Sequence, residues 1–109
     1  MSKVKEAVLA IFFTLFALST FAQTGSVRGR IIDAKTKKPL EFVNVSIRAT
    51  GTQTPLTGTV SDSTGVFRIN RVKNGAYTLT ASFIGYKSVE KEFTISPTAR
   101  NVNVKNILL

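Results

Sequence analysis

Apolar and polar residues alternate along short runs from Ser26 onward, and turn-forming residues separate the runs. The clearest run alternates Thr and Ser with Tyr77, Leu79, Ala81 and Phe83. A repeat of two places successive side chains on opposite faces of a strand, whereas an amphipathic helix needs a repeat of about 3.6. No run in this part of the sequence has the helical repeat. The sequence therefore predicts an all-β domain.

Further runs of the same kind predict strands over 27–32, 42–49, 56–61, 66–70, 87–95 and 102–108. The residues expected on the core-facing side of these runs are Val27, Gly29, Ile31, Val43, Val45, Ile47, Phe67, Ile69, Val89, Phe93 and Ile95. Turns are expected at 33–38, 50–55 and 62–65, where Asp, Gly, Thr and Pro gather. The dipeptide Asn74-Gly75 predicts a tight hairpin between the strands on either side of it. About seven short strands at even spacing predict an antiparallel two-sheet sandwich.

The N-terminal segment has the pattern of a cleavable export signal. Lys3 and Lys5 precede an almost continuous apolar run over 7–18, as a signal peptide requires. Small residues then predict cleavage between Ala22 and Gln23. A retained membrane anchor is the alternative, but a span needs about 20 apolar residues and this run is shorter. The chain has no cysteine, so a lipid anchor on a cysteine is excluded.

The predicted organisation is a signal peptide at 1–22 followed by one domain at 23–109. The 87 residues of that domain suffice for one compact core. They carry 13 basic and five acidic side chains, a net charge of +8, which favours anionic partners. For an exported chain these are lipid head groups, cell-wall polymers or acidic glycans rather than nucleic acid. The densest basic cluster is Lys35, Lys37 and Lys38, and the alternative is a solvated shell that keeps the domain soluble.

The composition excludes most catalytic chemistry. The chain has no histidine, cysteine or tryptophan, so Ser-His and Cys-His nucleophiles and zinc sites built on His or Cys are absent. Glu90 and Glu92 share one strand face, but Lys87 and Lys91 accompany them and indicate a solvated surface. We therefore predict that the protein is not an enzyme and has no catalytic, cofactor-binding or metal-binding residues.

Two further features favour a structural interpretation. The turn at 62–65 lacks the additional acidic ligands that a calcium loop requires. Most aromatic residues occupy alternate strand positions and are expected in the core. Tyr86, beside Gly85 in a turn, is the aromatic side chain expected to be exposed.

The order of these turns and core positions resembles the carboxypeptidase regulatory-like domain, a sandwich of transthyretin-like fold. The similarity covers most of the predicted domain. The residues that carry it are Gly29, Ile31, Asp33, Pro39, Leu40, Val43, Val45, Ile47, 61–67, Val72, Gly75, Tyr77, Leu79 and 82–87. The family more often has Thr where Ser61 stands.

A signal peptide followed directly by such a domain resembles the N-terminal extension of TonB-dependent receptors and related outer-membrane β-barrel proteins. The resemblance implies a non-enzymatic periplasmic accessory domain, associated with the outer membrane, whose partner is a plug and barrel in cis or in trans. Since the sequence stops at Leu109, either it is the front piece of a longer receptor or it is freestanding. The alternative function is a freestanding exported module that binds an anionic glycan or a membrane surface.

Overall fold

The computed structural model describes residues 24–109, and the predicted signal peptide at 1–22 lies outside that range. All regular elements within it are strands: β1 (Thr24–Ile32), β2 (Asn44–Ala49), β3 (Thr57–Val60), β4 (Val66–Lys73), β5 (Gly75–Ser82), β6 (Val89–Ile95) and β7 (Asn101–Leu108). Residues 24–109 include no helix long and apolar enough to span a membrane.

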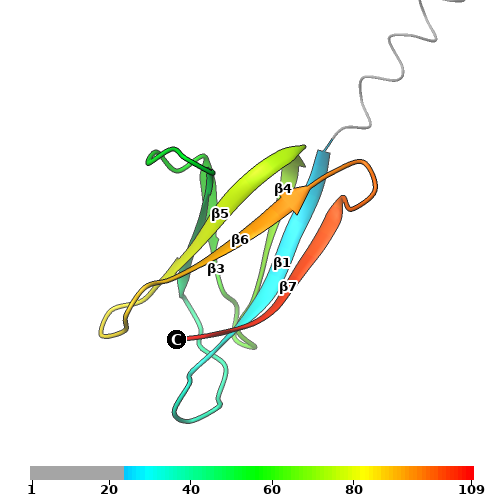
Figure 1. Ribbon diagram of the computed structural model, residues 1–109. Helices are drawn as coiled ribbons and strands as arrows, with labels where there is room; N and C mark the ends of the chain where they lie inside the picture. The colour runs from blue at the N-terminus through cyan, green and yellow to red at the C-terminus, as the bar shows by residue number, and fades with distance from the viewer. Residues whose placement is uncertain (1–23) are drawn as a thin grey trace, which may run out of the picture.

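The strands form a three-stranded sheet, β4-β1-β7, and a four-stranded sheet, β3-β2-β5-β6, which face each other (Figure 1). The predicted all-β two-sheet sandwich is thus confirmed. One pair departs from the expected antiparallel pattern, because β7 runs parallel to β1. The chain reaches β7 by crossing from β6 in the other sheet, and a crossing of this kind permits the parallel direction that a hairpin forbids.

The predicted hairpin at Asn74-Gly75 is wrong, because the strands on either side of it belong to different sheets. β4 pairs with β1, while β5 pairs with both β2 and β6. The Tyr77 hydroxyl donates a hydrogen bond of 2.7 Å to the Lys73 carbonyl and closes this crossing. The local turn signal is real, but the pairing of each strand with distant partners decides where the chain goes.

The core lies between the two sheets and contains almost all the side chains expected there. Its buried hydrophobic residues are Val27, Ile31, Val43, Val45, Ile47, Phe67, Ile69, Val72, Tyr77, Leu79, Ala81, Phe93, Ile95, Val104 and Ile107. Phe83 and Val89 are only partly buried against this core. Thr78 is buried as well, although it alternates with these apolar residues on β5. The alternation therefore identified the core faces correctly in both sheets.

Phe42 departs from the predicted strand over 42–49. Its backbone has a φ of 63°, in the left-handed region that interrupts a strand, and its side chain is 65% exposed. Ser61 holds the chain next to it. The Ser61 hydroxyl is buried, accepts a hydrogen bond of 2.9 Å from the Val43 N–H and donates one of 2.7 Å to the Leu40 carbonyl. Strand β2 consequently begins at Asn44.

Two β-bulges in the three-stranded sheet change which side chains face the core. The register of β1 shifts by one residue against β4 and by one against β7. Arg71 and Lys105 lie at these shifts with φ values of 59° and 60°. A bulge adds one unpaired residue to a strand and redirects those that follow. Val72 and Ile107 therefore point inward, three residues after the preceding core residue, and β4 extends past the predicted end at residue 70.

Two glycines let the strands and turns approach closely. A Cβ on Gly29 would lie 2.7 Å from the Val104 side chain and 2.8 Å from the Phe67 ring. Gly65 has a φ of 79°, and a Cβ there would lie 2.4 Å from the Ile31 carbonyl oxygen. Neither position has room for a larger residue. Gly29 lets the Phe67 and Val104 side chains pack closely over β1, and Gly65 lets the 62–65 turn lie against the backbone of Ile31.

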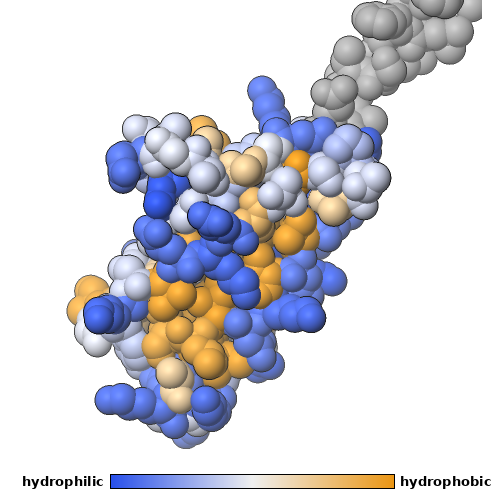
Figure 2. Space-filling view, in the orientation of Figure 1, coloured by the Kyte–Doolittle hydropathy of each residue, from blue (hydrophilic) through white to orange (hydrophobic). Residues whose placement is uncertain are grey.

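The sandwich is open where β6 and β7, the edge strands of different sheets, lie near each other. Figure 2 shows apolar side chains gathered in the middle of the face on which these strands lie, with hydrophilic residues around them. Val89 of β6 and Val102 of β7 are partly buried against the core. Lys91 extends from β6 and donates a hydrogen bond of 2.9 Å to the Val104 carbonyl of β7. This lysine joins the two sheet edges.

Candidate functional site

The two sheets differ in charge although they share one core. The three-stranded sheet has six basic residues and no acidic residue: Arg28, Arg30, Arg68, Arg71, Lys73 and Lys105. The four-stranded sheet has two basic and two acidic residues: Arg48, Lys91, Glu90 and Glu92. The strands of one sheet therefore sum to +6 and those of the other to zero. The fold concentrates positive charge on one side of the sandwich.

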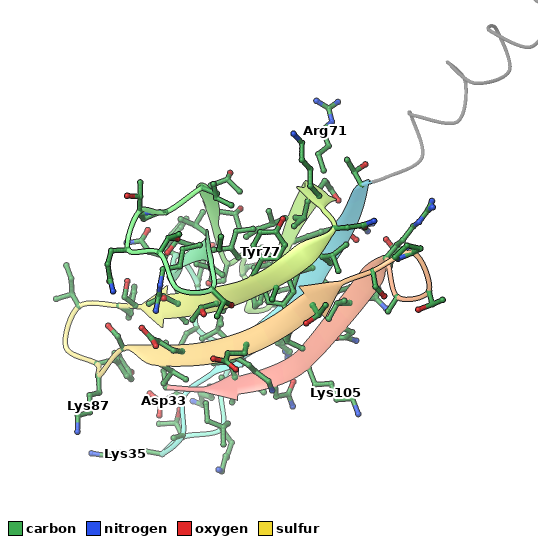
Figure 3. All side chains as sticks on the ribbon, turned by 45° about the horizontal axis from the view of Figure 1, so that its top comes forward. Asp33, Lys35, Arg71, Tyr77, Lys87 and Lys105 are labelled. Carbon is green, nitrogen blue, oxygen red and sulfur yellow. The ribbon has the colours of Figure 1, made fainter. Side chains whose placement is uncertain are left out.

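A hollow of about 430 Å³ lies on the outer face of the three-stranded sheet. Its lining residues are Arg28, Gly29, Arg30, Val66, Asn103, Lys105 and Asn106. Arg28 and Arg30 both face outward because they are two apart on β1. The bulge in β7 leaves both Lys105 and Asn106 exposed, and Figure 3 shows Lys105 projecting away from the sandwich. Three cations and two side-chain amides thus surround one surface depression.

Within residues 24–109 no salt bridge involves the cations that line this hollow. Asp62, whose pKa is lowered mainly by its hydrogen bond from the Thr64 hydroxyl, nevertheless lies near enough to Arg30 for that cation to lower the pKa of its carboxylate further. Arg28 lies directly opposite Arg68 in the β1–β4 register, and like charges in that arrangement destabilise a sheet. Arg30 donates a hydrogen bond of 2.9 Å to the Thr64 carbonyl, and Arg68 donates one of 2.9 Å to the Asn70 side chain. Neither acceptor is charged. An anion placed here would relieve repulsion that the fold itself leaves in place.

A second basic surface lies at the end of the sandwich where the β1–β2 and β5–β6 connections meet. Asp33 joins the two connections: it accepts hydrogen bonds from the backbone N–H groups of Lys35 (2.8 Å) and Thr36 (3.1 Å) and from the Tyr86 hydroxyl (2.5 Å). The Tyr86 ring packs against Phe83 with a centroid distance of 5.7 Å. Tyr86 is half-buried, so the expectation that it is exposed is wrong.

The Asp33–Tyr86 hydrogen bond changes the pKa of both side chains. Donation by the Tyr86 hydroxyl lowers the pKa of Asp33 below its ordinary value of 3.8, and the N–H groups of Thr36 and Lys35 lower it further. The same hydrogen bond raises the pKa of Tyr86 above its ordinary value of 10.0. The carboxylate is therefore ionised and the phenol neutral over a wide pH range. The pair acts as a tie between loops.

Exposed lysines extend from this tie. Lys35, Lys37 and Lys38, the predicted basic cluster, are all exposed on the β1–β2 connection. Figure 3 shows Lys87 of the β5–β6 connection at the same end of the molecule as Lys35. Ile84, also on the β5–β6 connection, is 96% exposed. This surface, which we call the lysine end, is separate from the arginine-lined hollow on the sheet.

The remaining carboxylates are engaged in structural contacts or lie in solvent. Glu90 accepts a hydrogen bond of 3.2 Å from Arg48, and Glu92 is exposed. Lys91 was expected to lie beside these glutamates on the solvated face. Its side chain instead extends to β7 and donates a hydrogen bond to the Val104 carbonyl. Asp62 accepts hydrogen bonds from Thr64 and Val66 within its turn. No group of three potential metal ligands exists within residues 24–109.

A family comparison matches almost the whole of this sandwich. The family model for the CarboxypepD_reg-like domain matches residues 27–108. The chain belongs to this family. The matched range contains all the strands apart from the first residues of β1. No curated protein matches the chain.

Solved structures share the fold of this CarboxypepD_reg-like domain. The major pilin subunit BcpA of Bacillus cereus is 16% identical with a TM-score of 0.61, over 79% of this chain and 29% of the pilin. The 5-hydroxyisourate hydrolase of Klebsiella pneumoniae is 21% identical with a TM-score of 0.57, over 79% of this chain and 86% of the hydrolase. The pilus 2b backbone protein of group B streptococcus is 18% identical with a TM-score of 0.60, over 76% of this chain and 41% of that protein. At these identities the likeness shows the fold alone.

The arginine-lined hollow of the CarboxypepD_reg-like domain was not predicted from the sequence. The predicted basic cluster contains residues that are neighbours in the chain, whereas the hollow is lined by residues from separate strands. Arg28 and Arg30 alternate on one strand, so their shared outward face was readable. Lys105 joins them in the hollow only through the β1–β7 pairing, and Arg68 lies beside Arg28 only through the β1–β4 pairing. No local pattern gives those pairings. One sequence feature could have indicated this basic surface: the strand segments 24–32, 66–73 and 101–108 contain basic residues but no acidic residue.

Proposed function

We propose that this CarboxypepD_reg-like domain is a non-enzymatic periplasmic accessory domain of an outer-membrane TonB-dependent receptor or related β-barrel protein. One observation carries the proposal: the family match begins at Val27, directly after the predicted cleavage site between Ala22 and Gln23. A domain at that position would be the first part of the exported chain. It supplies contacts or spacing to a plug and barrel, in cis or in trans, rather than transport chemistry.

The placement of the acidic side chains supports a role without catalysis. Asp33 and Asp62 hold turns through backbone and hydroxyl hydrogen bonds, and Glu90 is paired with Arg48. A general acid or base needs a pKa near the working pH. The pKa values of Asp33 and Asp62 are instead lowered by their hydrogen bonds, with the Tyr86 and Thr64 hydroxyls respectively as the largest cause. These carboxylates stabilise loops.

The gene sequence beyond the codon for Leu109 tests the receptor assignment. We expect a plug and barrel to be encoded in the same reading frame or in an adjacent gene. Co-purification of the domain with that barrel from outer membranes would then identify the partner. A stop codon with no neighbouring gene for a plug and barrel would rule the assignment out.

A second candidate function is a freestanding exported module that binds an anionic glycan or an anionic membrane surface. The opposed pair Arg28 and Arg68 favours it, because repulsion between them weakens the sheet unless an anion lies nearby. Retention on acidic polysaccharide beads and on anionic lipid vesicles should fall as salt rises, since screening weakens these contacts. Neutral beads and neutral vesicles are the controls. Retention that does not respond to salt would end this candidate.

Two matched variants separate the two basic surfaces. The double variant Arg28→Gln with Arg30→Gln removes charge from the hollow, and Lys35→Gln with Lys37→Gln removes the same charge from the lysine end. If the hollow is the site, the first variant loses most of the salt-sensitive retention and the second keeps it. The reverse result would assign binding to the lysine end, as the sequence analysis expected.

A further inference from the structure

The β3 edge of the four-stranded sheet has no charged residue to guard it. Of the four edge strands, β4 contains Arg68, Arg71 and Lys73, β6 contains Glu90, Lys91 and Glu92, and β7 contains Lys105. β3 has the sequence TGTV, and the whole segment 49–61 lacks Lys, Arg, Asp and Glu. Charged side chains on an edge prevent other strands from pairing with it. Three edges of this sandwich have that protection and one does not.

The backbone of β3 presents free hydrogen-bonding groups along this edge. β3 pairs antiparallel with β2, with Gly58 opposite Ser46 and Thr59 opposite Val45. The Ser61 N–H donates a bond of 3.1 Å to the Val43 carbonyl, which fixes the alternation of the ladder. The N–H and C=O groups of Thr59 then point toward β2, and those of Gly58 and Val60 point toward the open edge. An added strand would find both donors and acceptors there.

Depressions lie on both sides of the edge. On the outer face, a shallow hollow of about 450 Å³ is lined by Asn44, Val45, Ser46, Gly58, Thr59 and Val60. On the side that faces β4, a groove of about 320 Å³ is lined by Ile47, Leu56, Thr57, Arg71, Val72, Lys73 and Tyr77. The outer hollow has no charged residue, whereas the groove has two cations.

These depressions match the alternation of an added strand. Its side chains would point alternately to the outer face and to the groove. Residues facing the outer hollow would meet neutral side chains and the bare backbone of Gly58. Residues facing the groove would meet the cations of Arg71 and Lys73, which favour carboxylates. Figure 3 shows the Arg71 side chain projecting from its end of the sandwich.

We propose that β3 binds an extended segment of a partner protein as a fifth strand, and that this segment alternates neutral residues with Asp or Glu. Strand addition of this kind takes affinity from backbone hydrogen bonds and specificity from alternate side chains. Charge complementarity selects an acidic partner over a second copy, because a second copy would bring another net charge of +8 (residues 23–109). This binding mode goes beyond the proposed function and holds whether or not a barrel is attached.

Nuclear magnetic resonance on the purified protein tests this proposal with a synthetic peptide of about eight residues that alternates Thr and Glu. Hydrogen exchange at the Gly58 and Val60 amides should be fast in the free protein and slow with the peptide bound. The Thr57 and Thr59 amides, already directed to β2, should be protected in both states. A matched peptide that alternates Thr and Lys should bind at least about tenfold more weakly.

One substitution blocks the edge without changing a core residue, and a second at the same position is its control. Val60→Pro removes a backbone N–H that faces the open edge, a position where edge strands tolerate proline. It should abolish binding, while Val60→Thr, which keeps the N–H, should bind as the parent does. If Val60→Pro unfolds the protein, peptides methylated on alternate backbone nitrogens serve instead. Methylation in one register should abolish binding and in the other should leave it unchanged.

Three results would overturn the proposal. Equal binding of the Glu and Lys peptides would remove the role of Arg71 and Lys73. Peptide binding without new protection at Gly58 and Val60 would place the peptide elsewhere. Protection of these two amides without peptide, increasing with protein concentration and lost in Val60→Pro, would identify a second copy of the chain as the occupant of the edge.

Discussion

The three-stranded and four-stranded sheets bury their inner faces against each other but present different outer surfaces. The strands of β4-β1-β7 carry six basic residues without a carboxylate, two bulges and a glycine in contact with a core phenylalanine. The strands of β3-β2-β5-β6 are rich in Thr and Ser, have balanced charges and leave β3 unguarded. Since the two sheets share one core, the difference concerns what each face can bind rather than how the domain folds.

The difference in surface charge between the two sheets is not explained by solubility alone. A surface that only kept the domain soluble would intersperse both signs of charge, as the four-stranded sheet does with Arg48 and Glu90. The other sheet instead places Arg28 opposite Arg68. The structure thus concentrates cations on one sheet and leaves an edge strand without charged residues on the other.

The largest expected effect tests whether both sheets depend equally on the shared core. Phe67→Ala empties a site against Gly29 in the three-stranded sheet and should lower the free energy of unfolding by about 3–5 kcal/mol. Leu79→Ala, its counterpart in the four-stranded sheet, should cost about 2–5 kcal/mol. Denaturant titration measures both. Phe42→Ala is the control, because a side chain 65% exposed should change stability by no more than about 0.5 kcal/mol.

Adding one methyl group to the three-stranded sheet has the next largest effect. A Cβ at Gly29 would lie within 2.8 Å of the Phe67 ring, so Gly29→Ala should destabilise the protein by about 1–3 kcal/mol through overpacking. Combining it with Phe67→Leu, which removes the ring, should recover part of that loss. Additive effects of the two changes in denaturant titration would contradict direct packing between these residues.

Removing one arginine from each sheet should change stability in opposite directions. Arg28→Gln removes repulsion with Arg68 and should stabilise the domain by about 0.2–1 kcal/mol. Arg48→Gln removes the pair with Glu90 and should destabilise it by about 0.2–1 kcal/mol. Thermal melts at low and high salt measure both, and salt should reduce both changes. Changes of the same sign would refute the electrostatic contrast between the sheets.

The smallest effect is the pH dependence of the tie at the lysine end. Hydrogen bonds lower the pKa of Asp33 below 3.8 in the folded state. Its contribution to stability is therefore fully present above pH 3.8 and is lost as pH falls below that value through the folded pKa. The pKa of Tyr86 is raised above 10.0, so its contribution is present below pH 10.0 and is lost as pH rises through the folded pKa.

The variant Tyr86→Phe separates these two contributions in unfolding titrations at several pH values. The alkaline loss that Tyr86 causes should disappear, and the acid loss should become smaller but persist. It persists because the N–H groups of Thr36 and Lys35 still lower the pKa of Asp33, and because Asp62 has its own lowered pKa. An acid profile identical to that of the parent would show that the hydroxyl does not stabilise the Asp33 carboxylate.

The sequence correctly predicted features that depend only on the residues of a single strand, such as which of its side chains are buried. Alternation alone placed Val45, Ile47, Leu79 and other side chains in the core. It failed at Asn74-Gly75, where a good turn dipeptide connects two sheets instead of one hairpin. It also gave no warning of the bulge at Lys105, since a one-residue shift in register depends on the partner strand.

Whether a candidate surface could be predicted from the sequence depended on how far apart in the chain its residues lie. The lysine cluster at 35–38 was visible as a charge run, and its exposure is confirmed. The tie between Asp33 and Tyr86, which connects that run to the β5–β6 connection, joins residues 53 apart. Contacts of this length require the two connections to meet at one end of the sandwich, which no residue pattern near either one specifies.

By itself, the sequence determined that this domain is all-β, which face of most strands is buried, and that the charge balance is strongly basic. Only the tertiary structure decided that β4 and β7 both join β1, and this arrangement separates a sheet of charge +6 from a neutral one. The physical reason is that side-chain alternation fixes the inward face of a strand, whereas its backbone groups bond equally well to any strand. Burial is therefore readable along the chain, but the neighbours that build a binding surface are chosen by long-range pairing.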